Sequence, residues 1–160
     1  MDITRHLKTR GPSASHVLIL GARNVDETIT IARRHHAHAG EGRPFVPLTW
    51  AGLPDVLIES EILGHVRDGF PGAFREKPGA LEIAAGGTLV LLDGVETLPS
   101  SVTARLTRVL MTGRASRVGS LYATYAIDVS LVGTLRRPID ARADPALTRL
   151  CACFTILNAV

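Results

Sequence analysis

Five short apolar runs divide this chain of 160 residues, and segments of helical or loop character separate them. The runs predict β-strands at 16–20, 44–48, 88–92, 127–133 and 152–158. Strands that alternate with helices are typical of a mostly parallel sheet that is covered by helices. The sequence therefore predicts an α/β fold, a three-layer α/β/α sandwich around a parallel five-stranded sheet. Because 46% of the residues are hydrophobic, we expect a single domain over 1–160.

The segments between the strands carry signals for helix starts and ends. Apolar residues spaced along 25–38 predict a helix, and prolines open the predicted helices 54–63 and 100–112. Gly113 marks the end of the last of these. The segment 64–80 contains too many glycines and prolines for a continuous helix, so it is predicted to be a protruding loop or hairpin.

The segment 17–28 has the outline of a phosphate-binding loop without its phosphate-binding groups. An apolar strand leads to Gly21 and a helix follows, but the pattern G-x-x-x-x-G-K-[ST] is absent, and Asp26 and Glu27 stand at the start of the helix. A carboxylate about 4 Å from a phosphate oxygen repels it by roughly 4 kcal/mol at an effective dielectric constant of about 20. We therefore expect this loop to repel phosphates. Its acids suit the positive end of the helix, with Asn24 or Asp26 as the cap.

Residues 44–65 read PFVPLTWAGLPDVLIESEILGH. They resemble the central AAA+ domain of the sigma-54-dependent transcriptional activators, which reads P-F-V-x-V-N-C-A-x-L-P-x-x-L-x-E-S-E-L-F-G-H. Shorter matches follow in order at 86–89, 98–99, 105–110, 117–119 and 128–129, so the resemblance runs from about residue 17 to 156. It implies a P-loop NTPase core of the AAA+ type, with its five strands in the order 5-1-4-3-2.

A surface loop of that family, G-A-F-T-G-A, is pushed against sigma-54 by an ATP-driven ring. The matching residues 68–73 read DGFPGA, so Phe70, Gly72 and Ala73 are kept and Pro71 replaces the threonine. Proline fixes φ and removes a backbone donor, so we expect a stiffer loop that does not remodel sigma-54 in the family's way. An exposed Phe70 could still anchor another partner, or it could pack the hairpin onto the domain.

The end of the third predicted strand matches the family's acidic pair L-D-E, which holds magnesium and polarises the attacking water. This chain reads Leu-Leu-Asp-Gly at 91–94, so only Asp93 remains, and we expect it to cap a turn with Gly94. Thr134 matches the threonine of the family's A-T-N-R sensor, but Leu135 replaces the polar residue after it. The resemblance thus implies no intact catalytic residues and a degenerate nucleotide site at Gly21, Arg23, Asp26, Glu27, Asp93 and Thr134.

Arg142 and Arg149 resemble the arginines with which that family reaches the phosphate of a neighbouring subunit. They could serve an active partner in trans, or they could be solvated or pair with local acids, which is the favoured interpretation. No segment resembles the family's helical lid or its helix-turn-helix, so we expect an AAA+ core that lacks both.

The remaining residues give little support to other functions. The 18 basic residues are 16 arginines and two lysines that lie scattered along the chain, whereas a nucleic-acid surface usually shows a clustered stripe, so direct DNA binding is not expected. His35, His36 and His38 lack a fourth ligand with suitable spacing, so we expect no metal and a helix end that faces water.

The cysteines and the apolar runs bear on location. Cys151 and Cys153 lie two apart in the apolar run of the last predicted strand, a spacing that does not suit a disulfide between them. No apolar stretch reaches the roughly 20 residues of a membrane span, and no signal peptide stands out. We expect a reduced, cytoplasmic protein.

The departures from the family pattern predict that the chain is not an enzyme. It is expected to be a pseudo-ATPase without a cofactor that acts as a protein-interaction or regulatory module in bacterial transcription or signalling. The expected partner is a protein, such as an active AAA+ relative or another regulator, and a homo-oligomer and a mixed ring both stay open. The alternative is a residual ATP-binding protein or weak ATPase that uses magnesium and Arg23, whose planar fork can grip phosphate.

Overall fold

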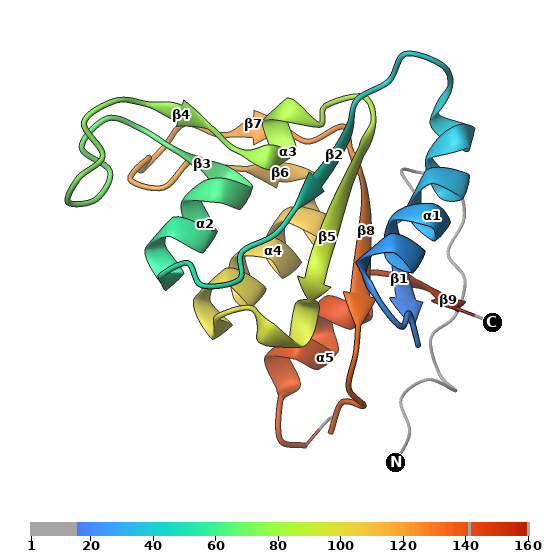
Figure 1. The fold of residues 1–160 in the computed structure, drawn as a ribbon. Coiled ribbons are helices and arrows are strands. Elements are labelled where there is room, and N and C mark those ends of the chain that lie inside the picture. Colours follow the sequence, from blue (N-terminus) through green and yellow to red (C-terminus); the bar gives the residue numbers. More distant parts are fainter. Residues whose placement is uncertain (1–15, 141, 160) are drawn as a thin grey trace.

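The structure, a computed structural model, describes residues 16–140 and 142–159, and a parallel sheet forms its centre (Figure 1). Its strands are β1 (Val17–Leu20), β2 (Phe45–Leu48), β5 (Thr88–Gly94), β8 (Ser130–Leu135) and β9 (Thr155–Asn158). They lie in the order β2-β5-β8-β1-β9, and every neighbouring pair is parallel. Counted over these five strands from the β9 edge, this is the predicted order 5-1-4-3-2. The labels differ because two small hairpins add four further strands.

Helices cover both faces of the sheet, which confirms the α/β/α class (Figure 1). Along one face lies α1 (Val25–His36), which continues into the 3₁₀ turn η2 (Ala37–Ala39). The other face carries α2 (Asp55–Leu63), α3 (Ala80–Ile83), α4 (Ser100–Thr112) and α5 (Pro145–Cys151), with the 3₁₀ turn η3 (Val95–Thr97) after β5. None of the helices in the described ranges is long and apolar enough to cross a membrane.

Alternation along the strands divides the buried side chains into two cores. In β1, Ile19 packs with Ala32 of α1, whereas Leu18 packs with the larger core that includes Leu106 of α4. Successive residues of a strand point to opposite faces, so an apolar strand needs a helical layer on each side. This is why the nearly continuous apolar runs of the sequence identify central strands.

Two hairpins project from one end of the molecule (Figure 1). The segment 64–80 forms the predicted hairpin, with β3 (Gly64–His65) paired to β4 (Lys77–Pro78), and the second contains β6 (Arg114–Ala115) and β7 (Tyr125–Ala126). The hairpins touch, because Val66 N donates to Val118 O at 3.1 Å. At Gly119, where φ is +80°, a β-carbon would lie 2.2 Å from Cα of Gly69, so this contact requires glycine.

The last predicted strand begins later than the sequence suggests. Residues 145–151 form α5, capped by the Asp144 side chain, and the strand starts only at Thr155. Cys151 therefore ends a helix and is buried, which raises the pKa of its thiol to about 12, and Cys153 lies in the following turn. Both cysteines are free, but the premise that they share a strand is wrong, because a short apolar run fits a buried helix face as well as a strand. The fourth strand likewise begins at Ser130 rather than 127.

Candidate functional site

In the loop after β1, the polar side chains form hydrogen bonds with one another and with the loop's own backbone. Gly21 has φ +79°, and Asn24 caps α1 by accepting a hydrogen bond from Glu27 N at 2.9 Å. Glu27 also accepts bonds from Arg23, at 2.7 Å from the backbone N and at 3.3 and 3.2 Å from Nε and Nη2. Asn24 rather than Asp26 is thus the cap. The positive charge that could meet a phosphate is already paired with a carboxylate four residues away.

This pairing changes the electrostatics that the sequence predicts for the loop. Hydrogen bonds from Arg23 lower the pKa of Glu27, and Glu27 raises that of Arg23, so both are charged near neutral pH. The Arg23 side chain is 82% exposed and the Glu27 side chain 19%. A phosphate in this loop would therefore compete with Glu27 for an accessible guanidinium.

Asp93, at the end of β5, fixes the segment that leads from β2 to α2. Its Oδ2 accepts hydrogen bonds from Thr49 Oγ1 at 2.7 Å, Trp50 N at 2.7 Å and Ala51 N at 3.1 Å. The expected turn with Gly94 is therefore wrong, because the carboxylate reaches across to the neighbouring strand. A single anionic oxygen holds three donors of one loop, and charge-assisted bonds of this kind are stronger than neutral ones.

A second carboxylate, Glu96, lies close to the end of the same strand, and the sequence analysis missed it. Its Oε1 accepts a bond from Arg136 N at 3.0 Å, while its Oε2 is buried and has no partner among the described residues. A β-carbon on Gly94 would lie 2.4 Å from Oε2 of Glu96. The carboxylate of Glu96 therefore fills the space that a side chain at position 94 would need. In the sequence, only the glycine at position 94 indicated that Glu96 lies there.

Thr134 is the third polar group at these strand ends. It is buried, its Oγ1 has no partner within the described ranges, and the sheet register pairs it with Gly94. A cavity of about 410 Å³ opens nearby, lined among others by Trp50, Asp93, Thr97 and Arg136. The predicted positions Asp93 and Thr134 thus lie at the ends of adjacent strands, and Gly21 follows β1 at the same carboxyl edge of the sheet.

The predicted arginines of the neighbouring α5 region stay at the surface. Arg142 follows β8 in a turn, where its backbone N donates to Oδ1 of Asp140 at 2.9 Å, and Arg149 is in the last turn of α5. Both residues are exposed, and within the described part of the chain neither side chain forms an ion pair.

In the hairpin of β3 and β4, the structure decides between the two alternatives for Phe70. Phe70 packs edge-on against the ring of His65, with centroids 5.1 Å apart, and Ala73 is buried. Pro71 and Gly72 form the exposed tip. Phe74 is 80% exposed, so it, and not Phe70, is the apolar group that this hairpin presents.

The second hairpin adds to this surface. Leu121 and Tyr122, in the loop between β6 and β7, are 85% and 93% exposed. Because the two hairpins touch, the loops that carry these residues and Phe74 lie at one end of the molecule (Figure 1). We call Phe74, Leu121 and Tyr122 the hairpin surface.

A family model for the sigma-54 interaction domain matches residues 1–149. The chain belongs to this family. The family predicted from residues 44–65 is thereby confirmed.

Curated relatives of the sigma-54 interaction domain are bacterial regulators. The chain is 45% identical over 104 residues to the nitric oxide reductase transcription regulator NorR1 of Cupriavidus necator, covering 65% of this chain and 20% of that protein. It is 35% identical over 142 residues to the DNA-binding transcriptional regulator NtrC of Klebsiella pneumoniae, covering 88% of this chain and 30% of that protein. The chain thus spans between a fifth and a third of these relatives.

Solved structures of NtrX from Brucella abortus share the fold of this sigma-54 interaction domain. One has a TM-score of 0.72 at 24% identity and covers 98% of this chain and 34% of that chain. The complexes with ADP and with ATP have TM-scores of 0.68 and 0.67 at 24% and 23% identity; both cover 92% of this chain, and they cover 33% and 32% of the NtrX chain.

The prediction that this chain is not an enzyme is contradicted by these comparisons. The chain belongs to the sigma-54 interaction domain family, and NtrX, which has the same fold, has structures in complex with ADP and with ATP. The prediction rested on the absence of the lysine and of the acidic pair from the sequence pattern.

Proposed function

We propose that this chain is the single AAA+ core of a sigma-54-type transcription regulator, that it binds ATP and hydrolyses it weakly, and that its hairpin surface contacts a protein partner. The observation that carries the nucleotide proposal is Oε2 of Glu96 near the end of β5, which is buried and has no hydrogen-bond partner among the residues that the structure describes. A carboxylate oxygen without a donor in a protein interior is costly, and a bound cation or ordered water would offset that cost.

The polar groups at the strand ends fit magnesium with ATP. Magnesium prefers carboxylate and water oxygens, and Asp93 and Glu96 are the residues that would hold it. The ion would neutralise the charge of the phosphates when it is bound. Thr134 would offer a hydroxyl beside them, since its Oγ1 has no partner among the described residues.

The loop after β1 fits phosphates less well than a standard loop does, which supports weak activity. Arg23 takes the place of the absent lysine, and its planar fork can bind two phosphate oxygens. To do so the guanidinium must leave Glu27, which holds it through two hydrogen bonds. Nucleotide affinity should therefore depend on both residues, in opposite directions.

We predict that Arg23→Ala weakens ATP binding about tenfold and that Glu27→Gln strengthens it, because the first change removes the phosphate-binding cation and the second releases it. Isothermal titration calorimetry with ATP and magnesium measures both. Arg34→Ala is the control, since Arg34 is also an exposed arginine and lies near the other end of α1. Millimolar ATP that fails to bind the unaltered protein, or equal affinities for it and Arg23→Ala, would refute the proposal.

The hairpin surface supports the partner part of the proposal. Three large apolar side chains that stand almost free of the protein are typical of an interaction site. We predict that Phe74→Ser weakens binding to sigma-54 protein about tenfold, because a large exposed side chain at a contact is the usual source of affinity. Biolayer interferometry with immobilised sigma-54 gives the dissociation constant.

Two further variants make the partner test specific. Val25→Ser removes an exposed apolar side chain on the opposite face of the sheet and should leave the affinity unchanged. Phe70→Leu keeps the packing against His65 approximately and should also have little effect. If Phe74→Ser binds as tightly as Val25→Ser, the hairpin surface is not the contact.

A further inference from the structure

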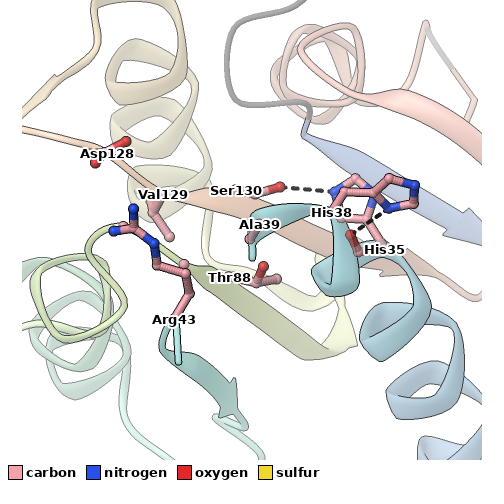
Figure 2. Close-up of a pocket in the computed structure, with 10 residues that line it drawn as sticks. His35, His38, Ala39, Arg43, Thr88, Asp128, Val129 and Ser130 are labelled. Atoms are coloured by element: carbon pink, nitrogen blue, oxygen red, sulfur yellow. Dashed lines mark hydrogen bonds between the residues drawn. The ribbon is translucent and has the colours of Figure 1, made fainter. Parts of the chain in front are cut away.

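A second cavity, of about 280 Å³, lies at the edge of the sheet opposite the nucleotide site (Figure 2). It is bounded by the end of α1 and η2, by the residue Arg43 before β2, and by the residues that open β5 and β8. Because the strands are parallel, their amino ends meet at this edge and their carboxyl ends at the other. The two sites are therefore separate.

Histidines from the end of α1 hold one wall of the cavity in place. His35 Nε2 lies 3.0 Å from Ser130 Oγ, and His36 Nδ1 lies 2.8 Å from the buried Thr88 Oγ1. The expectation that these histidines simply face water is therefore wrong. His38 Nδ1 donates to His35 O at 3.1 Å, which leaves its Nε2 for a ligand.

The opposite side of the cavity carries one positive and one negative side chain. Figure 2 shows Arg43 and Asp128 on this side, with the Arg43 guanidinium extending toward the level of Asp128, and His35 and His38 across from them. Both residues are exposed, and no ion pair joins either to any other residue that the structure describes. Two opposite charges line one small cavity without neutralising each other.

This charge arrangement selects a ligand that carries both signs. Asp128 would repel a simple anion such as phosphate, and Arg43 would repel a simple cation. A zwitterion meets both, because guanidinium binds a carboxylate in a bidentate manner and a carboxylate binds an ammonium group. The volume of the cavity is just below the roughly 300–1,000 Å³ that small-molecule sites occupy, so the ligand has few heavy atoms.

We propose that this cavity binds a free amino acid, with the ligand's carboxylate on Arg43 and its ammonium group on Asp128. The side chain of the amino acid then faces Nε2 of His38 and the small residues Ala39 and Gly87. This inference does not depend on ATP binding, since none of the residues that line the cavity belongs to the carboxyl edge of the sheet.

The test is a thermal-shift screen of the unaltered protein with each standard L-amino acid at millimolar concentration, followed by calorimetry of the best one. We expect at least one amino acid to bind, its methyl ester and its N-acetyl derivative to bind at least about tenfold more weakly, and Arg43→Gln and Asp128→Asn each to cause a similar loss. Arg108→Gln, a change at an exposed arginine of α4, is the control and should have no effect.

The other outcomes overturn the proposal. Failure of every amino acid to bind would do so, as would binding that survives both Arg43→Gln and Asp128→Asn. Tighter binding of phosphate or acetate in Asp128→Asn than of any amino acid in the unaltered protein would identify an anion site instead. Both variants affect exposed side chains, so circular dichroism should show them folded.

Discussion

Replacing Asp93 with alanine will lower the free energy of unfolding by about 3 kcal/mol, a large effect for a residue that is not fully buried. The reason is that one carboxylate oxygen accepts three hydrogen bonds, two of them from the backbone N–H groups of Trp50 and Ala51. Hydrogen bonds to a charged group stabilise a protein by about 1.5–3 kcal/mol, and the abandoned backbone donors add a cost where water cannot reach them. Urea unfolding followed by circular dichroism measures the change.

Two variants show whether the three hydrogen bonds are the cause. Thr49→Val removes the hydroxyl donor alone and should cost about 1 kcal/mol. Asp128→Asn changes an exposed aspartate that forms no ion pair within the described ranges and should stay within about 0.5 kcal/mol of the unaltered protein. If Asp93→Ala is no more destabilising than Asp128→Asn, then Asp93 does not hold the segment between β2 and α2.

The fold could be predicted from the sequence wherever a local signal and a long-range pattern agreed. The helix 100–112 is found at its predicted bounds, because Pro99 precedes it and Gly113, with φ +70°, ends it. The strand order came from the family resemblance and not from periodicity. In contrast, α5 was missed because it has only seven residues and its apolar side chains merge with the strand that follows.

The sequence predicted where the candidate site lies, but not the contacts that its residues make. The ends of β5 and β8 were identified through Asp93 and Thr134, but the partners of Asp93 lie 42 to 44 residues away and no local pattern reveals them. Glu96 was missed because its place against Gly94 depends on the register shift near the end of β5. The pairing of Arg23 with Glu27 was accessible in principle, since residues four apart often interact where a helix begins.

The two phenylalanines of the hairpin illustrate the same limit. The sequence left open whether Phe70 is exposed, because both alternatives fit a loop of glycine and proline. The position of Phe70 depends on the ring of His65, against which it packs. Hydrogen bonds hold that ring in place: Nδ1 lies 2.6 Å from Ser60 Oγ, and Nε2 lies 2.8 Å from Arg75 O. Contacts of this kind follow from the folded backbone and not from spacing.

His16 should make this protein less stable as the pH falls from 6.5 to about 4. Burial, together with the charge of His35, lowers the pKa of His16 to about 4, from an ordinary value of 6.5. Its Nδ1 accepts a hydrogen bond from Leu131 N at 3.1 Å, so the neutral ring is the form that the fold binds. As the pH falls from 6.5 to about 4, the unfolded chain takes up a proton at His16 and the folded chain does not, so stability that is present above pH 6.5 is progressively lost.

We predict that this single residue accounts for a loss of about 3 kcal/mol by about pH 4, since each pH unit between the two pKa values corresponds to about 1.4 kcal/mol. The variant His16→Asn keeps an acceptor near the position of Nδ1 but does not titrate, so its unfolding free energy should fall less steeply between about pH 6.5 and 4. Urea unfolding at a series of pH values gives both slopes. His38→Gln, at an exposed histidine, should retain the slope of the unaltered protein. If His16→Asn loses stability as steeply as the unaltered protein, the acid sensitivity comes from other groups. His16 would then be protonated in the folded state, at the expense of its hydrogen bond from Leu131 N.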